Sequence, residues 1–271
     1  MSDLSAIPNR RQRVQSAETG MAVLKGLARL GGRASLTALA VHVDESPAKV
    51  HRYLASLMEE GLVAQDAGSQ HYHLGAEAIQ IGLAAMRQAD PIRVAEPSLI
   101  RLRESLEVTC FVAVMGNKGP TIVRFEEPGL PVTVNVRVGS VMSMLWSATG
   151  RVFLGLLDGS RVRALAQEEW ATASADMRAM LDATDPIGQV CEELRQHQCA
   201  TVRDTYQRGI SAVAAPVYDH AGHVCAVLTA LGATGGFDPS VDGVIATAVR
   251  REAAAASALL GGERFVVVSA P

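Results

Sequence analysis

The sequence predicts an α+β protein made of two parts. In residues 16–75, apolar residues repeat at helical spacing through three segments and then alternate through two short strand-like runs. From residue 108 onward, strand-like runs come first, helices follow, and strands return before a final helix. Groups of strands separated by groups of helices are typical of a domain with a mainly antiparallel sheet.

The first two helices are marked by their ends. Apolar residues at helical spacing predict a helix over 17–30, and the glycines Gly31 and Gly32 end it. Ser35 then provides an N-cap for a second, shorter helix over 36–43, because its hydroxyl can accept from a backbone N–H of the first turn.

The third helix has the clearest signals. Ser46 is a suitable N-cap, Pro47 occupies the first helical position, where its missing N–H costs nothing, and Gly61 ends the helix. The opposite face from the apolar stripe carries Lys49 and Arg52. The stripe itself consists of Val50, Leu54, Leu57 and Met58.

Two short runs after the third helix, 62–66 and 70–75, alternate like the strands of a hairpin. Three helices followed by a small hairpin is the pattern of a winged helix-turn-helix. For an isolated helix, the polar face with Lys49 and Arg52 is most simply a solvated surface. The order of elements favours a DNA-reading surface, because the amino end of the third helix enters the major groove in such domains and favours phosphate.

A helix connecting the two parts is expected over 76–90. Its apolar residues Ile79, Leu83 and Met86 form a stripe that needs a packing partner. Asp90 and Pro91 then start another helix.

The domain boundaries follow from these signals. Pro97 inside the helix that starts at Pro91 should kink it or mark its true start. We predict, in order, a flexible arm, a DNA-binding domain, a linker helix, a larger effector-binding domain and a tail, over residues 1–15, 16–75, 76–90, 91–262 and 263–271.

The larger domain should contain six strands and several helices. Helices are expected over 147–159, two or three times within 161–197, and over 238–262. Strand-like runs, separated by Gly-, Asn- and Pro-containing turns, cover 109–117, 120–128, 131–140, 199–204, 210–219 and 223–233.

Composition limits the class of protein. The chain of 271 residues is 48% hydrophobic and 20% charged, which suffices for real cores and excludes a disordered protein. No uncharged apolar run of about 18 residues exists, so no membrane span is expected. The first residues have no apolar core of the signal-peptide kind, so we expect a cytoplasmic protein. The cysteines form no C-x-x-C pair or zinc spacing and are expected to be reduced and mostly buried: Cys110, Cys191, Cys199 and Cys225.

The charge pattern gives no strong basic field. Residues 1–90 hold nine basic and nine acidic residues, so this part is neutral, whereas the rest of the chain is net acidic. A nucleic-acid partner would therefore be met by a few placed side chains and by helix ends.

With both parts in view, the chain resembles the IclR family of bacterial transcription regulators over roughly residues 15–262. The N-terminal resemblance is carried by AVLKGLARLGGRASLTALAVHVDESPAKVHRYLASLMEEGLV and YHLG. The C-terminal resemblance is carried by VGSVMSMLWSATGRVFLGLL and RGISAVAAPVYDHAGHVCAVLTALG. The order and spacing of these stretches are the specific signal.

The resemblance implies a winged helix-turn-helix domain, a linker helix and a GAF-like domain that binds a small metabolite. It also implies self-association as a dimer or a dimer of dimers on double-stranded operator DNA. In such proteins the third helix and the wing contact DNA, and phosphate contacts can come from Ser35 and Thr37. The positions of the third helix and the wing are Ser46, Pro47, Lys49, His51, Arg52, Ser56, His71 and Tyr72.

The family's effector cavity lies between the sheet and the segment that ends in ATG. Carried over by motif, the candidates here are Met144, Leu145, Trp146, Val202, Arg203, Asp204, Ala212, Thr229 and Leu231. Members that bind small polar keto or hydroxy acids often carry Cys or Ser where this chain has Ala212 and Leu231. This departure, with Trp146 nearby, points to a bulkier effector, an aromatic or otherwise bulky acid.

Plainer interpretations of some candidates stay open. Trp146 is also what a core aromatic looks like, and Thr229 can reflect β-propensity alone. Arg203 and Asp204 can simply pair at the surface.

Other chemistries find little support. His71 and His73 place two imidazoles on one strand face, but zinc needs further ligands and none is evident. The segment 147–150 before a helix could cradle an anion, although helix capping is its ordinary explanation. No nucleophile–base pair, P-loop or dinucleotide fingerprint appears. We therefore expect no metal, no cofactor and no enzymatic activity.

The sequence thus predicts a DNA-binding regulator that reads an operator as a dimer and is controlled by a small organic metabolite. The alternative, motivated by the neutral N-terminal part, is a small-molecule-binding scaffold or an enzyme whose winged helix makes protein contacts.

Overall fold

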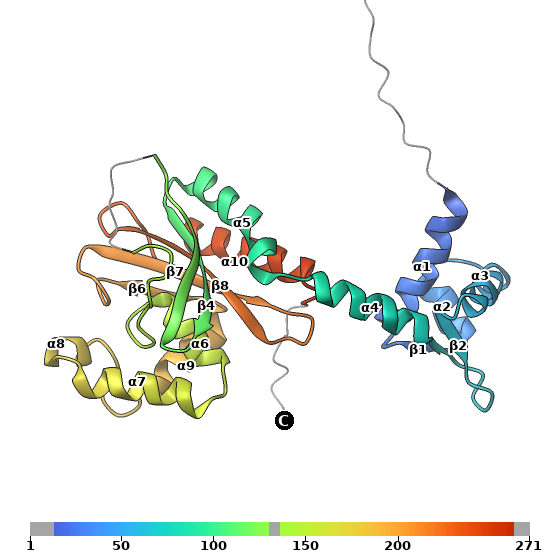
Figure 1. Ribbon diagram of the computed structural model, residues 1–271, viewed down its shortest axis with the longest axis horizontal. Helices are drawn as coiled ribbons and strands as arrows, with labels where there is room; N and C mark the ends of the chain where they lie inside the picture. The colour runs from blue at the N-terminus through green and yellow to red at the C-terminus, as the bar shows by residue number, and fades with distance from the viewer. Residues whose placement is uncertain (1–13, 130–135, 263–271) are drawn as a thin grey trace, which may run out of the picture. The chain divides into compact units, whose positions relative to one another are not determined.

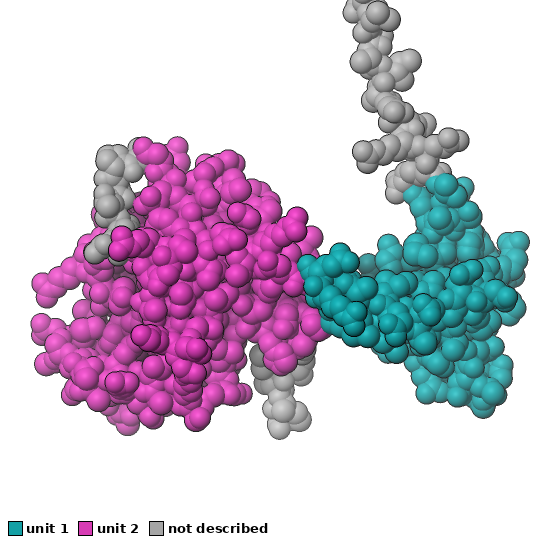
Figure 2. Space-filling view, viewed as in Figure 1, with its two compact units in different colours: residues 1–88 teal, residues 89–271 magenta. Residues whose placement is uncertain are grey.

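The computed structural model describes residues 14–129 and 136–262, so the predicted tail and almost all of the predicted arm lie outside the described residues. The chain divides into two compact units at residues 88 and 89 (Figure 2). Each unit is described by itself.

The first unit contains the three expected helices, α1 Gln15–Arg29, α2 Leu36–His42 and α3 Pro47–Glu59. Both predicted N-caps are confirmed. Ser35 accepts a hydrogen bond from the backbone N–H of Ala38, and Ser46 accepts one from that of Lys49.

A three-stranded antiparallel sheet completes the first unit. Its strands are β1 Arg33–Ala34, β2 Val63–Gln65 and β3 Tyr72–Leu74, in the order β1-β3-β2. The hairpin β2–β3 was predicted, but β1 was not, because two residues are too few to show alternation. The helices and this sheet enclose a small core that includes Val23, Leu27, Leu39, Val50, Leu54, Val63 and Tyr72.

The helix α4 Ala76–Gln88 follows β3 and has no buried residue. Its apolar stripe is open to solvent in the single chain, with exposed fractions of 59% for Ile79 and 38% for both Leu83 and Met86. The expected packing partner is therefore not supplied by the described part of this chain.

The second unit is built on a five-stranded antiparallel sheet in the order β5-β4-β8-β7-β6. Five of the six predicted strands are present: β4 Thr109–Gly116, β5 Gly119–Glu126, β6 Ala200–Arg203, β7 Ile210–Tyr218 and β8 Val224–Ala233. The sixth, over 131–140, falls partly outside the described residues, and its described part, 136–140, forms no strand.

Helices cover both faces of this sheet (Figure 1). On one face lie α5 Pro91–Leu106 and α10 Val244–Leu259. On the other lie α6 Ala148–Leu156, α7 Ser160–Thr172 and α9 Pro186–His197, with the short α8 Ala175–Arg178 between the last two. Alternate residues of β4 enter the two cores: Phe111 and Ala113 face α6, whereas Cys110 and Val112 face α10.

Two helix boundaries refine the sequence predictions. Asp90 caps α5 as expected, and the helix continues through Pro97, which is therefore not its start. The final helix begins at Val244 rather than at 238, because the Asp238 carboxylate accepts from the backbone N–H of Ser240 and holds a turn there.

The cysteines are free thiols, three buried and one half-buried, as expected. Burial raises the pKa of the Cys110 thiol to about 12 and that of Cys225 to about 11, so both are neutral near pH 7. None of the helices in the described part is both long and apolar enough to span a membrane.

Candidate functional site

The outer face of α3 is open along its length. Ser46, Pro47, His51, Arg52 and Ser56 are exposed. The opposite face is anchored, since Val50 and Leu54 are fully buried in the core of the first unit. The amphipathic pattern therefore fixes which side of α3 faces solvent.

The two cations of this face differ in their surroundings. The Lys49 ammonium lies 2.6 Å from the Glu45 carboxylate one turn earlier, which partly offsets its charge. Arg52 forms no ion pair with any residue in the described ranges. Arg52 is thus the guanidinium on α3 that is available for bidentate contact with a base edge or a phosphate.

The start of α2 presents two further predicted contacts. Thr37 is exposed, whereas Ser35 is half-buried and its hydroxyl accepts from the N–H of Ala38. Hydroxyls and free N–H groups at a helix start suit phosphate contacts.

The wing requires a correction. Tyr72 was expected among the DNA contacts, but only 3% of its surface is exposed, because β3 is the central strand and alternation directs Tyr72 into the core. His71 precedes it, is half-buried, and its Nδ1 lies 3.1 Å from the carbonyl oxygen of Ser69.

Arg33 is a surface cation that the sequence did not single out. It donates to the Ser69 hydroxyl at 2.9 Å and lies 3.5 Å from the Asp66 carboxylate, so it braces the wing turn. Hydrogen bonds from Ser69 hold the pKa of Asp66 below its usual value. No sequence signal pointed to Arg33, because β1 was too short to predict.

The second unit contains a narrow cavity between its sheet and the start of α6. It has about 400 Å³ of space outside the protein atoms, including its mouth. None of its lining residues carries a charged side chain. They are Phe111, Val136, Met142, Ser147, Ala148, Thr149, Val202, Tyr206, Gln207, Ile210, Ala212, Thr229 and Leu231.

Four of the nine predicted effector residues line this cavity: Val202, Ala212, Thr229 and Leu231. Both positions at which this chain departs from the polar-acid pattern, Ala212 and Leu231, are therefore part of the wall. They lie opposite each other in the β7–β8 pair.

Three other predicted effector residues do not line this cavity. Met144, Leu145 and Trp146 are at most 4% exposed and belong to the core behind the cavity wall. The Trp146 ring stacks on Trp170, with centroids 6.1 Å apart and an interplanar angle of 22°. Trp146 therefore lies in the core.

Arg203 and Asp204 also lie off the cavity wall. The Asp204 carboxylate accepts from the backbone N–H of Gly209 at 2.7 Å and from the Thr234 hydroxyl at 2.9 Å. Asp204 therefore closes the loop that carries the lining residues Tyr206 and Gln207.

The polar end of the cavity is the N-terminus of α6. Ser147 caps the helix by accepting from the N–H of Gly150 at 2.9 Å, and its carbonyl accepts from the N–H of Arg151. Within the described residues, the N–H groups of Ala148 and Thr149 have no acceptor. The Thr149 and Thr229 hydroxyls, both buried, are 2.9 Å apart. Free N–H groups and hydroxyls at a helix start suit an anion.

The sequence foresaw this polar end only in part. The sequence marks 147–150 as a possible anion cradle, but it gives no signal for Phe111, Tyr206 and Gln207. Alternation places Phe111 on one face of β4, yet nothing in the sequence tells what lies opposite that face.

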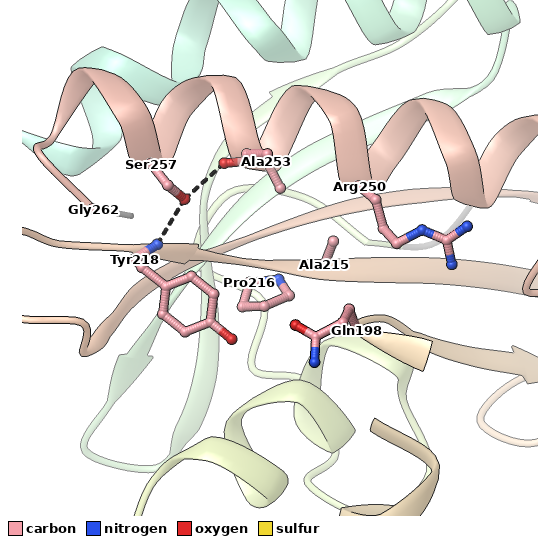
Figure 3. A pocket seen from close by; sticks show the side chains of 9 residues that line it. Gln198, Ala215, Pro216, Tyr218, Arg250, Ala253, Ser257 and Gly262 are labelled. Atoms are coloured by element: carbon pink, nitrogen blue, oxygen red, sulfur yellow. Dashed lines mark hydrogen bonds between the residues drawn. The ribbon is translucent and has the colours of Figure 1, made fainter. Parts of the chain in front are cut away.

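A second cavity lies between α10, β7 and the end of α9 (Figure 3). Its cation, Arg250, donates to the His197 carbonyl and to the Cys199 sulfur, both at 3.2 Å. Arg250 thus caps the C-terminal end of α9, where cations are favourable. Burial raises the pKa of the Tyr218 phenol in the same cavity. We assign no ligand to this place.

No cluster of His, Cys, Asp or Glu suited to a metal occurs in residues 14–129 and 136–262. Burial lowers the pKa of the Arg151 guanidinium beside α9, and the Glu193 carboxylate opposes this shift. Arg151 donates to the carbonyls of Leu145 and Thr201, so it is structural.

Three helices with a small sheet in one unit, and a sheet covered by helices with an uncharged cavity in the other, are the architecture of a helix-turn-helix regulator with a second domain. Comparison with known proteins agrees. Residues 16–67 match the model of the IclR helix-turn-helix domain, and residues 83–258 match that of the bacterial transcriptional regulator IclR C-terminal domain. The chain belongs to the IclR family of transcriptional regulators, and its α+β fold, with a helix-turn-helix domain and an effector domain, is the one predicted.

Individual relatives include two repressors. The crystal structure of Pseudomonas aeruginosa HmgR is 38% identical, covers 93% of this chain and 100% of its own, and has a TM-score of 0.84. The Agrobacterium tumefaciens repressor BlcR, 16% identical with a TM-score of 0.74, covers 92% of this chain and 98% of its own and shares the fold. The Escherichia coli (strain K12) transcriptional repressor AllR is 24% identical over 233 residues, which are 84% of this chain and 83% of AllR.

The Thr149–Thr229 hydroxyl pair allows a test of the cavity's polar end. We expect Thr229→Val to lower the free energy of unfolding by about 1–3 kcal/mol, because the buried Thr149 hydroxyl loses its partner. Adding Thr149→Val should cost little more, since no hydroxyl then remains unpaired. Denaturant unfolding of the full chain measures both, and strictly additive costs would show that the two hydroxyls do not depend on each other.

Proposed function

We propose that this regulator reads operator DNA as a dimer and is controlled by a bulky, aromatic carboxylic acid bound in the cavity beside α6. The observation that carries the proposal is the pairing of an uncharged, largely apolar cavity with free N–H groups at one end of it. The protein would have one arrangement that binds DNA and another that does not. The ligand would bind one of the two more tightly and so shift the equilibrium toward it.

The cavity chemistry supports an aromatic acid over a small polar one. Phe111, Ala212 and Leu231 offer contact to a ring rather than hydrogen bonds. A carboxylate needs donors when buried, and the N–H groups of Ala148 and Thr149 and the Thr229 hydroxyl supply them. We therefore orient the ligand with its carboxylate toward α6 and its ring toward Leu231.

The DNA interface is proposed from exposure and charge. It consists of the exposed side of α3 with Arg52 at its centre, the start of α2 with Thr37, and the wing turn braced by Arg33. The neutral charge balance of residues 1–90 implies few phosphate contacts and a modest salt dependence. Two such units in a dimer would read half-sites about one or two helical turns apart.

Self-association is proposed to use the open stripe of α4. Ile79, Leu83 and Met86 lie at i, i+4 and i+7, and Gly82 among them adds no side chain, so a second copy of the helix could approach closely. Covering these side chains removes apolar surface from water.

The alternative is a small-molecule-binding scaffold or an enzyme whose winged helix makes protein contacts. Its support is the neutral balance of residues 1–90. A gel-shift titration against the DNA that flanks the gene separates the two. Salt-sensitive binding at nanomolar to micromolar protein supports the regulator, and its absence supports the alternative.

Arg52→Ala tests the DNA interface. We expect specific operator binding to weaken by about 1–3 kcal/mol, because a bidentate base contact is lost. Arg87→Ala on α4, which also removes an exposed arginine, is the control and should bind as the wild type. Equal weakening on random DNA would make Arg52 a phosphate contact only, and unchanged binding would remove it from the interface.

Ala212→Leu tests the cavity. The larger side chain would fill the space proposed for the ring, so we expect the affinity for benzoate and phenylacetate, measured by calorimetry, to fall at least about tenfold. Ala255→Leu, at an exposed position of α10, should leave the affinity unchanged. Wild-type affinity in Ala212→Leu would place the ligand elsewhere.

Ile79→Glu combined with Leu83→Glu tests self-association. Charges on the stripe should oppose its burial, so sedimentation velocity should report a shift toward monomer. Gln80→Glu adds a charge one position away from the stripe and should keep the wild-type assembly. An unchanged sedimentation coefficient in the double variant would exclude α4 as the interface.

A further inference from the structure

One wall of the cavity is carried by residues 143–147, here called the wall segment, which leads into α6. Met142 just before it and Ser147 at its end line the cavity, whereas Ser143, Met144 and Leu145 do not. The position of these two lining residues therefore depends on how the four residues between them, 143–146, are held.

A single carboxylate, that of Glu169, holds three of these residues: Ser143, Met144 and Leu145. Glu169 Oε1 accepts from the backbone N–H of Met144 at 2.8 Å. Its Oε2 accepts from the N–H of Leu145 at 2.9 Å and from the Ser143 hydroxyl at 2.6 Å. Successive N–H groups that converge on one anion form a nest, in which the negative charge strengthens each bond.

The same carboxylate is linked to Trp146, the fourth residue, through the Ser143 hydroxyl. The Ser143 hydroxyl that donates to Glu169 also accepts from the backbone N–H of Trp146 at 2.9 Å. Glu169 forms no ion pair with any described cation, so its charge is balanced by these neutral donors. Its position on α7 makes that helix part of the support of the cavity.

Other contacts fix the wall segment from different directions, so Glu169 is not its only anchor. The Arg151 guanidinium donates to the carbonyl of Leu145 at 3.0 Å, and the Thr205 hydroxyl donates to that of Trp146 at 2.7 Å. Gly150 is packed so closely that a Cβ there would lie 2.0 Å from the carbonyl oxygen of Ser143. The two hydrogen bonds engage carbonyls of the wall segment. The backbone N–H groups of Met144 and Leu145 are bound by Glu169.

We propose that Glu169 is a positioning residue for the effector cavity, which sets the wall segment in the shape that receives the ligand. The inference rests on the proposed function for its ligand, but the hold on the wall segment can be measured without one. Loss of the Glu169 carboxylate would free the N–H side of the segment while the core behind it stays packed.

Glu169→Gln is the sharpest variant because it keeps the size of the side chain. Each carboxylate oxygen faces a backbone N–H, so the amide nitrogen must face a donor in either orientation. Glu168→Gln, at the exposed neighbouring position, is the matched control. Ser143→Ala is a milder second variant, because both backbone bonds to Glu169 remain.

Hydrogen exchange of the full chain, followed by mass spectrometry, measures the hold on the wall segment. We expect Glu169→Gln to speed exchange of peptides covering 142–149 at least about tenfold and to leave those of β7 and α10 unchanged. Ser143→Ala should lie between Glu169→Gln and the wild type, and Glu168→Gln should match the wild type. Unchanged exchange in Glu169→Gln, or equally fast exchange throughout the second unit, would overturn the proposal.

Calorimetry with benzoate and phenylacetate on the same variants adds the binding readout. The affinity should fall in the order in which exchange rises. Faster exchange with wild-type affinity would also overturn the positioning role. If the wild type binds neither probe, the ligand class in the proposed function fails, and the exchange result by itself decides the role of Glu169.

Discussion

The second unit depends on covering both faces of one antiparallel sheet. The inner strands β4, β7 and β8 are apolar on both sides, so a helical layer is needed on each side to keep water from them. The layer of α5 and α10 closes one face. On the other face, the cavity lies between the start of α6 and residues of β4, β6, β7 and β8. The candidate ligand site is thus a consequence of how the sheet is covered.

A helix N-terminus inside such a layer needs hydrogen-bond acceptors from elsewhere, because the first N–H groups of a helix have no partner within it. Ser147 satisfies that of Gly150, and those of Ala148 and Thr149, two residues that line the cavity, have no acceptor among the described residues. The segment that brings the chain to this point is tied to α7 by Glu169, to α6 by Arg151 and to the 204–209 loop by Thr205. The cap of α6, the segment before it and the 204–209 loop are therefore joined by one set of hydrogen bonds beside the cavity.

The first unit works by a simpler principle. A small core of residues from α1, α2, α3 and the three-stranded sheet fixes which side of α3 is left outside, and the Ser46 cap fixes where that helix begins. The exposed side then carries Arg52 without an ion-pair partner among the described residues. Because residues 1–90 carry no net charge, recognition must come from placed groups rather than from a general field.

The sequence by itself determined the fold class, the helices α1 to α3 with their caps, five strands of the sheet and the family. These depend on local periodicity and on cap and turn residues, which act over a few neighbours. Only the tertiary structure decided that Tyr72 is core, that Trp146 stacks on Trp170 behind the cavity wall, and that Phe111 and Tyr206 line it. The role of Glu169 was equally hidden, since its partners lie about two dozen residues away. Such facts depend on what lies opposite a side chain, and that is set by packing between segments distant in the chain.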